Sequence, residues 1–600
     1  MSSVIGVTVR SDETAVTLPV RKTDGRTRKR VQLAILFVIG VFYFGLSLYL
    51  LRAEMRKTGF LTYPLDDTYI TMAIAKNLAL HGVWGITQNG FSSASSSPGL
   101  VLLLAGVFRL AGPSAWWPLA LSVGFGFLAL ILAQRLLSSA GLTTEFCGLC
   151  AILFFTPLPV LGLLGMEHAL HVALTLAFLD VAGFTLAEGR PPSWGLLLLT
   201  GLMVSVRYES LFMVMVACLL FFSQRKVLAA AWMGLAGAAP VAIYGVFSVL
   251  HGSDWLPQSV GLKGLPLSAA INRPTAMMRW FEDNLAHAPY MLALIAAMTI
   301  LLALPVVRVD RRATSMLAIV LGATLFHLAL AQVGWVYRYE AYLIAAGIAV
   351  IACALPNVRV APEQWANTAL ATIAGATLAQ LLFAYEGKVY SHELYVLAPA
   401  IAITFWGAFR GRLSRGHLGT AALLVAGLIG AGMLYQRTRE AVHTLPYGSL
   451  AVYSQQIQTA RFLHRYEEGA SVAANDVGAI NYYANIRCLD LVGLGDRDVY
   501  WLKKEGRFST AALSQLAETR HVKIAVVYDS WFSTSQQRFS GPPLPHSWVR
   551  VARWQTPYGT FLGDTTVSFY ATDVAEAGRL RTALDEFAPS LPPGVQVFDR

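Results

Sequence analysis

The residues most able to do chemistry in this sequence are ionisable side chains at the ends of long apolar runs. An aspartate pair, Asp66-Asp67, follows the first such run and leads into an amphipathic stretch that ends at Leu80. The other members, in chain order, are Glu167, Arg207, Glu209, Lys263, Arg338 and Glu340. Charges at a membrane boundary are costly, so they are usually functional or paired with one another.

These residue types together indicate one kind of reaction. Carboxylates near a water–lipid boundary suit a general base, and Arg and Lys beside them suit a phosphate leaving group. An apolar groove between helices suits a lipid tail. We therefore predict transfer of a group from a lipid-linked phosphate donor onto an acceptor outside the cell.

Each residue also has a structural interpretation, which the sequence alone leaves open. The aspartate pair can cap a helix, and Glu167 can be favoured by the dipole of a first helical turn. The two Arg–Glu pairs can be plain ion pairs, and Lys263 can be a solvated loop charge. His168 and His171 have the spacing of metal ligands, but no fourth ligand is evident, so we predict no metal centre.

The elements that position these residues must be membrane helices. The chain has 600 residues, of which 55% are hydrophobic and only 14% charged, and its mean hydropathy is +0.53. Soluble domains carry about 25% charged residues. This composition excludes a water-soluble multidomain protein, a disordered chain and a fibrous repeat. The five cysteines are too few for a disulfide scaffold, and four lie in apolar runs.

We predict about thirteen spans. The first is 31–51, long enough to cross a bilayer at about 1.5 Å per residue. The run 99–110 is too short to cross and predicts a juxtamembrane helix. The remaining predicted spans are 118–136, 146–164, 169–186, the short hairpin halves 194–206 and 211–222, 227–250, 291–307, 316–333, 342–355, 368–383, 394–405 and 418–434.

The distribution of cations predicts the orientation of these spans. The formal net charge is +11, and the basic residues of the leader and of alternate loops fall on one side. Because positive loops stay in the cytoplasm, we place the N-terminus inside, in an inner or plasma membrane. The ionisable residues named above then gather on the outer face.

The predicted spans and their orientation divide the chain into three parts. A cytoplasmic leader (1–30) precedes a transmembrane catalytic domain (31–436), whose first outer loop (52–113) holds the juxtamembrane helices. Residues 437–600 are more polar and alternate β-rich runs with helical stretches, which predicts a soluble extracytoplasmic α/β domain. The fold class is thus a polytopic α-helical membrane protein with a C-terminal α/β domain.

Several motifs, in order, resemble the GT-C superfamily of membrane glycosyltransferases. They comprise the Asp66-Asp67-Thr68-Tyr69-Ile70 segment, Gly165-Met166-Glu167, Arg207-Tyr208-Glu209, the loop from Gly252 to Lys263, Arg338-Tyr339-Glu340-Ala341-Tyr342-Leu343, and Asn475-Asp476-Val477-Gly478-Ala479-Ile480. The likeness is nearest to bacterial arabinofuranosyltransferases and protein mannosyltransferases. Departures include His168, Tyr208 for Pro, Gln258-Ser259 for Asn-Thr, and a serine-rich loop, 91–97.

The resemblance implies roles for individual residues. Asp66 would be the general base of a single displacement with inversion, and Asp67 would orient the acceptor or Asp66, or hold a divalent ion if one is used. No other cofactor is expected. Substrate binding would fall to Glu167, Arg207, Glu209, Lys263, Arg338, Glu340 and Tyr69, with the cations Arg207, Lys263 and Arg338 compensating the departing phosphate.

The function implied is an inverting, polyprenyl-phosphate-dependent glycosyltransferase of cell-envelope glycan biosynthesis. It would move a hexose or a pentofuranose, arabinofuranose being one candidate, to an extracytoplasmic glycan, lipid or protein; no nucleic acid is involved. The alternative is a polytopic transporter or a lipid or glycolipid flippase. That alternative calls for ionisable groups near mid-span and a pseudo-repeat, whereas these charges lie at one boundary.

Overall fold

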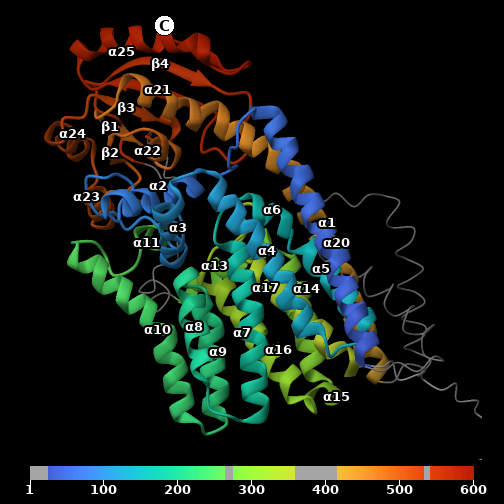
Figure 1. The fold of residues 1–600 in the computed structure, drawn as a ribbon. Helices are drawn as coiled ribbons and strands as arrows, with labels where there is room; N and C mark the ends of the chain where they lie inside the picture. The colour runs from blue at the N-terminus through green and yellow to red at the C-terminus, as the bar shows by residue number, and fades with distance from the viewer. Residues whose placement is uncertain (1–24, 264–273, 358–414, 533–540, 600) are drawn as a thin grey trace, which may run out of the picture.

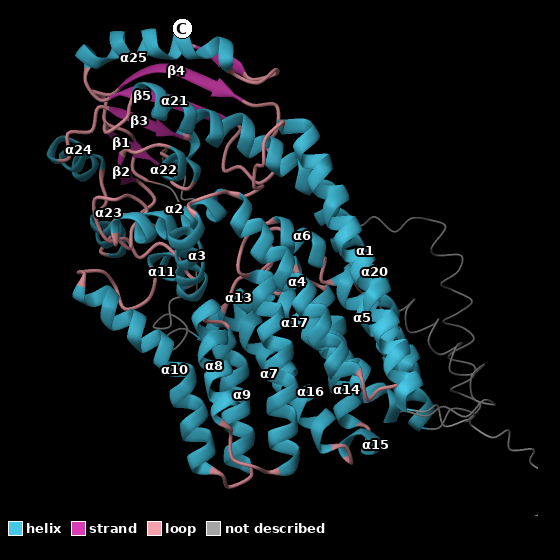
Figure 2. Ribbon diagram, in the orientation of Figure 1, coloured by secondary structure: helices cyan, strands magenta, loops and turns pink. Residues whose placement is uncertain are grey.

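The computed structural model describes residues 25–263, 274–357, 415–532 and 541–599. Figure 1 shows a bundle of helices with a smaller unit at one end, formed by the C-terminal part of the chain. In the described residues every strand lies in that unit, as Figure 2 shows. We call the two parts the bundle and the sheet unit.

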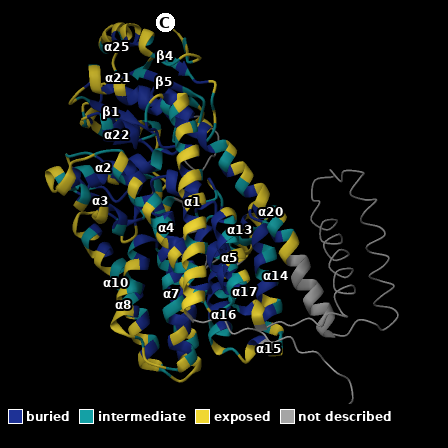
Figure 3. Ribbon diagram, turned by 45° about the vertical axis from the view of Figure 1, so that its right-hand side comes forward, coloured by how far each residue is buried: buried dark blue, intermediate teal, exposed yellow. Residues whose placement is uncertain are grey.

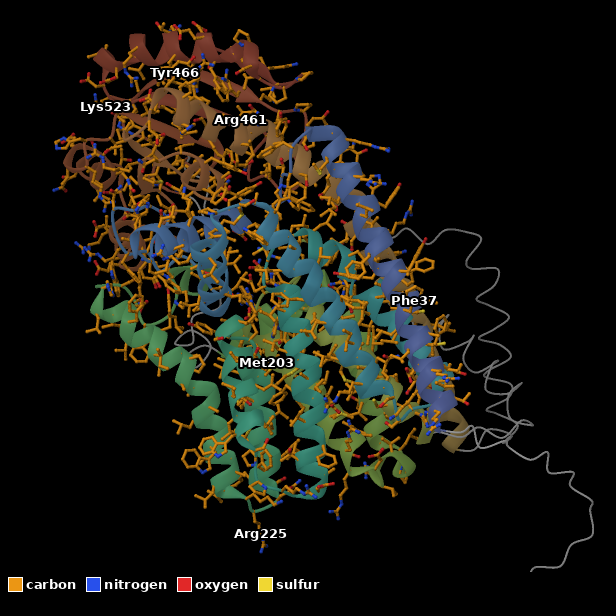
Figure 4. The ribbon with its side chains drawn as sticks, in the orientation of Figure 1. Phe37, Met203, Arg225, Arg461, Tyr466 and Lys523 are labelled. Carbon is orange, nitrogen blue, oxygen red and sulfur yellow. The ribbon has the colours of Figure 1, made fainter. Side chains whose placement is uncertain are left out.

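Helix α1 (Gly25–Thr58) runs along the side of the bundle with an apolar face turned outward. Leu33, Phe37 and Tyr49 are between 66% and 71% exposed, and Figure 4 shows Phe37 on the outer side of the helix. Large apolar side chains exposed in a row mark a surface that is covered by lipid or by protein. A helix of this length and composition can cross a bilayer.

Five described helices are long and apolar enough to cross a membrane, or six if a bent pair counts as one span. They are α1, α4 (Trp116–Leu137), α7 (His168–Glu188), α10 (Val227–Leu250) and α16 (Arg311–Leu330). The bent pair is α13 (Pro274–His287) and α14 (Tyr290–Ala303), with an angle of 102°. The chain is therefore an integral membrane protein.

Shorter apolar helices lie among the long ones and at the end of the bundle that faces the sheet unit (Figure 1). They are α3 (Pro98–Ala111), α5 (Leu142–Phe155), α8 (Trp194–Val206), α9 (Ser210–Ser223) and α17 (Ala341–Ala354), with the short turns α6 (Leu158–Leu163), α11 (Gln258–Lys263), α15 (Pro305–Arg308) and η1 (Leu355–Asn357). Helices therefore form at every expected span that the structure describes. The total of about thirteen is not established, because 368–383 and 394–405 lie outside the described residues.

Two sequence signals explain where these helices start. Asp310 accepts hydrogen bonds from the N–H groups of Arg312 and Ala313 and caps α16. Ser193 accepts one from Leu196 and caps α8. Such caps satisfy N–H groups that have no partner within the helix.

The sheet unit contains a mixed six-stranded sheet in the order β2-β1-β3-β5-β4-β6. The strands are β1 (Ser471–Ala474), β2 (Arg487–Asp490), β3 (Ile524–Val527), β4 (Val549–Gln555), β5 (Thr566–Ala571) and β6 (Gln596–Phe598). β1 pairs in parallel with β2 and β3, and Val472 lies opposite Cys488 and Ile524. The other three pairings are antiparallel. β3 is apolar throughout and fully buried, as expected for a strand covered on both faces.

Helices cover the sheet and connect it to the bundle. They are α22 (Ala479–Tyr483), α23 (Arg497–Lys504), α24 (Thr510–Thr519) and α25 (Val574–Phe587). α20 (Arg415–Val452) rises from the bundle and continues through the π-helical turn η3 (Tyr453–Ile457) into α21 (Gln458–Tyr466). The domain boundary expected at 436/437 therefore falls within one continuous helix.

Helix α2 (Asp66–His81) lies between the bundle and the sheet unit (Figure 1) and packs on α3 and α22. It ends at Gly82, whose left-handed backbone lets its N–H bond to the carbonyls of Asn77 and Leu78. Figure 3 shows buried residues continuing from the bundle into the sheet unit. The first turn of α2 is thereby held against both parts.

The loops at the far end of the bundle carry cations. Figure 4 shows Arg225 at this end, next to Lys226, whose ammonium group bonds to the carbonyl of Gly189. Arg135 and Arg312 both pair with Asp180. Positive loops favour the cytoplasmic side, so the sheet unit is expected outside; the direction of the chain termini remains a prediction.

Candidate functional site

A cavity of about 750 Å³ lies at the end of the bundle that faces the sheet unit. Its polar wall includes five of the residues predicted from the sequence: Asp67, Glu167, Arg207, Glu209 and Arg338. The rest of the cavity is mainly apolar and extends between α9 and α10. That part is lined by Leu211, Phe212, Val214, Met215, Cys218, Gly234 and Val241.

Arg207 is the centre of a buried ion-pair group. Its side chain is 7% exposed and that of Glu167 only 2%. The guanidinium Nη1 donates to Glu167 Oε1 at 2.9 Å, and Nε donates to Glu209 Oε2 at 3.1 Å. A second contact to Glu209 makes that pair bidentate, the geometry in which Arg binds carboxylates and phosphates most strongly.

A tight turn before α7 places Glu167 in this group. Gly165 has φ of +64°, and a Cβ atom there would lie 2.4 Å from the ring of Tyr63. Glycine adopts this backbone region without steric cost. The Gly165-Met166-Glu167 motif therefore has a conformational reason for its glycine.

Arg338 forms the second buried cation of the cavity. It is 2% exposed, pairs with Asp67 and contacts the hydroxyl of Tyr339 at 3.1 Å. Its Nε has no hydrogen-bond partner among the described residues. Burying a guanidinium is expensive unless carboxylates or other acceptors surround it, so Asp67 both neutralises and positions Arg338.

The loop before Arg338 has a strained backbone. Trp335, Val336 and Tyr337 have φ values of 46°, 63° and 56°. Left-handed backbone costs of order 1–3 kcal/mol for such residues and persists only where surrounding contacts enforce it. A β-branched residue such as Val336 is a genuine outlier there.

The contacts that enforce this loop come from Glu340. Its buried carboxylate accepts from Tyr290 Oη at 2.6 Å, from the N–H of Gly334 at 2.9 Å and from Arg437 Nη2 at 3.2 Å. Arg437 also bonds to the carbonyl of Tyr337. Glu340 is fully buried and is not part of the cavity lining. In this structure Glu340 braces the loop of Arg338, and its role in substrate binding stays a prediction.

Tyr69, also predicted to bind substrate, lies outside the cavity lining. It is fully buried, and its hydroxyl accepts the N–H of Tyr63 at 3.0 Å. Its ring packs against Tyr63, Tyr482 and Tyr483. Because it faces this aromatic core and does not line the cavity, its role is to pack α2 against the sheet unit. Lys263 ends α11, and its side chain lies outside the described structure.

Asp66 faces the sheet unit and Asp67 faces the cavity. Asp66 Oδ2 accepts the N–H of Gly478 at 2.7 Å, and Oδ1 accepts that of Ala479 at 2.8 Å. Burial raises the pKa of Asp66 to about 8, with a further increase from the neighbouring charges of Asp476 and Asp67. The two N–H groups oppose this shift because they stabilise the carboxylate.

Gly478 allows this close contact. A Cβ atom at this position would lie 2.1 Å from the backbone oxygen of Asp66 and 2.7 Å from its Oδ1. Next to it, Asp476 accepts hydrogen bonds from Gln456 at 2.9 Å and from the hydroxyl of Tyr528 at 2.5 Å. The segment 475–479, noted in the sequence as a motif, therefore brings a second carboxylate and two N–H donors to Asp66.

A second tie joins the loop before α11 to the sheet unit. Asp254 Oδ2 accepts from Tyr500 at 2.6 Å and from Lys504 at 2.5 Å. These two donors lower the pKa of Asp254 despite the opposing effect of its partial burial. The loop that lines one side of the cavity is therefore held by the sheet unit.

No metal centre is evident in the described residues. They contain no group of three or more His, Cys, Asp or Glu side chains placed to hold an ion. His171 Nε2 lies 2.9 Å from Ser210 Oγ, and His168 packs against the ring of Tyr339. The two histidines therefore have packing and hydrogen-bonding partners within the bundle.

Sequence comparison identifies one family model. Residues 447–570 match "Domain of unknown function (DUF8728)", which covers the end of α20, all of η3 and most of the sheet unit. A comparison with curated proteins finds no match.

Solved structures include two similar proteins. One is ArnT from Cupriavidus metallidurans bound to undecaprenyl phosphate, with 13% identity and a TM-score of 0.47 over 92% of this chain and 99% of that chain. The other is the oligosaccharyltransferase of Archaeoglobus fulgidus in the apo form, with 12% identity and a TM-score of 0.45 over 92% of this chain and 75% of that chain.

The contact at Gly478 can be tested directly. We expect Gly478→Ala to separate the loop from Asp66, because the added methyl group overlaps the Asp66 backbone. The amide of Ala479 should then exchange its hydrogen at least tenfold faster in hydrogen-exchange mass spectrometry. Gly578→Ala in α25, where a Cβ meets nothing within 4 Å, is the control. Unchanged protection of Ala479 would contradict the contact.

The brace formed by Arg437 and Glu340 gives a second test. Arg437→Met leaves Glu340 buried without its cation, which costs about 3–5 kcal/mol of unfolding free energy. The Tm in detergent should fall clearly, and Arg437→Met combined with Glu340→Gln should recover part of the loss. If the double variant were as unstable as the sum of the single variants, the two side chains would not be coupled.

Proposed function

We propose that this protein is a membrane glycosyltransferase of the GT-C type that uses a polyprenyl-phosphate-linked sugar. The observation that carries the proposal is the single cavity that joins an apolar passage between α9 and α10 to a wall with two buried guanidinium groups and their carboxylates. An isoprenoid chain, a phosphate and a sugar differ in the surroundings they need. This cavity has an apolar part suited to the isoprenoid chain and buried cations suited to the phosphate.

The apolar part fits the lipid chain of the donor. Its lining consists mainly of aliphatic and aromatic residues of α9 and of the facing surface of α10. A hydrocarbon chain gains about 0.8 kcal/mol for each buried CH₂ group. The donor can therefore be held by its tail while its polar end reaches the buried charges.

Arg338 and Arg207 fit the phosphate. Both are held in position before a ligand arrives, and Arg338 keeps an unpartnered Nε. In a partly desolvated site, cations fixed where negative charge develops stabilise the leaving group without reorganisation. As polyprenyl phosphate departs, these guanidinium groups would compensate its increasing charge.

Asp66 is the proposed general base, oriented by the N–H groups of Gly478 and Ala479, while Asp67 neutralises Arg338. The acceptor hydroxyl loses its proton to Asp66, its oxygen forms a bond to the anomeric carbon, and the bond from that carbon to the phosphate oxygen breaks. One displacement of this kind inverts the configuration. A carboxylate with a raised pKa is a better proton acceptor near neutral pH than one paired with Arg338.

The two aspartates also divide the site spatially. Asp67 lines the cavity and contacts Arg338, so the donor belongs on its side. Asp66 contacts the sheet unit, so the acceptor would approach between α2 and that unit. We propose an extracytoplasmic glycan, lipid or protein as the acceptor and a hexose or pentofuranose, such as arabinofuranose, as the sugar.

A transporter or flippase fits the described geometry less well. Such proteins place ionisable groups near mid-span. Here Glu167, Arg207 and Arg338 gather at the end of the bundle next to the sheet unit, and Asp66 is bound to that unit. A general base that is bound to a unit outside the bundle is suited to a group-transfer reaction. A transporter has no need of such an arrangement.

The base assignment predicts a pH dependence. The pKa of Asp66 is about 8, and only its deprotonated form accepts a proton. We therefore expect the transfer rate to rise between pH values of about 6 and about 9, with a midpoint near 8. Asp476→Asn should move the midpoint to lower pH, because it removes a nearby negative charge.

Asp66→Asn should lower transfer by about 100-fold or more and abolish this pH limb. The assay uses purified protein, a radiolabelled polyprenyl-phosphate sugar and envelope acceptors. The thermal midpoint of the variant checks its folding. Normal turnover by Asp66→Asn, with activity lost instead in Asp67→Asn, would transfer the role of base to Asp67.

The phosphate assignment predicts a loss of donor affinity. Arg338→Ala should weaken binding of polyprenyl phosphate about tenfold or more, since hydrogen bonds to charged groups contribute about 1.5–3 kcal/mol. Arg190→Ala, at the far end of the bundle, should leave binding unchanged. An equal affinity of wild type and Arg338→Ala would remove Arg338 from the phosphate site.

A further inference from the structure

One wall of the cavity carries hydroxyl groups from two loops that are far apart in the sequence. Ser95 and Ser96 lie just before α3, and Ser259 lies in α11; all three line the cavity. The N–H of Gln258 donates to the carbonyl of Ser93 at 2.9 Å and joins the two loops. We call Ser95, Ser96 and Ser259 the hydroxyl face.

The hydroxyl face has unused hydrogen-bonding capacity. Ser259 is only 7% exposed, and its Oγ has no hydrogen-bond partner in the described structure. Ser95 Oγ accepts a hydrogen bond from the N–H of Ser97 at 3.1 Å. Ser96 Oγ accepts one from Arg207 Nη1 at 3.2 Å. A serine hydroxyl has one proton to donate and two lone pairs, so each retains hydrogen-bonding capacity.

Buried polar groups are normally paired, and an unpaired one needs an explanation. Tyr208 Oη is a second orphan: the residue lines the same cavity, and its hydroxyl also lacks a partner among the described residues. A ligand with several neutral hydroxyl groups would satisfy both orphan atoms. An apolar ligand would leave them unpaired.

The charged side chains of the cavity wall are three carboxylates and two guanidinium groups, so negative charge is in excess. Arg207 is shared between Glu167 and Glu209, and Arg338 pairs with Asp67. A further carboxylate placed against the three serines would be buried without a counter-ion of its own. Such burial is strongly unfavourable.

We propose that the hydroxyl face binds the ring hydroxyls of the donor sugar and selects a neutral sugar over uronic acids. The position is suitable, because Ser96 contacts Arg207 and thus lies next to the cation assigned to the phosphate. This inference rests on the proposed polyprenyl-phosphate donor and specifies the class of sugar that the donor carries.

The test compares two ligands on the full-length protein in nanodiscs. One is polyprenyl phosphate alone, and the other is the same lipid carrying a neutral pentose or hexose. Wild type should bind the sugar-bearing lipid more tightly. Ser259→Ala should bind the sugar-bearing lipid about 3- to 10-fold more weakly than wild type. Its affinity for polyprenyl phosphate should be unchanged.

Ser253→Ala is the matched control. Ser253 lies in the same loop, is 6% exposed and has an Oγ without a described partner, but it does not line the cavity. It should change neither affinity. Ser95→Ala provides a second variant of the hydroxyl face, and binding of polyprenyl phosphate reports in every case that the cavity is intact.

Two results would overturn the proposal. One is that Ser259→Ala and Ser95→Ala both bind the neutral-sugar lipid as wild type does. The other is that a lipid carrying a uronic acid binds as tightly as the neutral one. Failure of the proposed function looks different, because wild type would then not bind polyprenyl phosphate at all.

Discussion

Two guanidinium groups buried at one end of a helical bundle determine how the surrounding elements are arranged. Arg207 and Arg338 are 6% and 2% exposed, and such burial is tolerated only where carboxylates compensate it. Those carboxylates come from three different places: Glu167 before α7, Glu209 before α9 and Asp67 in α2. The ends of these helices must therefore converge on the cations. Their convergence creates the polar wall of the cavity.

The sheet unit is connected to this arrangement through one turn of α2. Successive residues of a helix point about 100° apart, so Asp66 and Asp67 cannot face the same partner. Asp67 turns to Arg338, and Asp66 turns to the N–H groups of Gly478 and Ala479. A displacement of the sheet unit would act on Asp66 and, through its neighbour, on the wall of the cavity.

The sequence was most informative where burial of a charge is expensive. Asp67, Glu167, Arg207, Glu209 and Arg338 were identifiable because ionisable residues next to apolar runs need partners or a function. All five line one cavity. Helix positions were likewise predictable from apolar runs, whereas the number of membrane crossings was not, because short apolar helices do not show whether they cross.

The direction of a side chain, and its contacts with residues far away in the sequence, could not be predicted from the sequence. Glu340 and Tyr69 stand in motifs beside site residues, but helix geometry turns one toward Arg437 and the other into an aromatic core. Arg437 itself carried no signal, since an arginine after an apolar run is ordinary. Ser259 was similar: a serine gives no indication of burial until the fold places it against a cavity.

A single helix supports both sides of the Asp67–Arg338 pair. α20 carries Arg437, which with Glu340 enforces the strained backbone just before Arg338. The same helix continues through η3 and α21 into the sheet unit that holds Asp66. Because a helix is stiff along its axis, it fixes the distance between the loop of Arg338 and the unit that positions α2. The position of Arg338 relative to Asp66 and Asp67 therefore depends on α20. This helix contributes no residue to the described lining of the cavity.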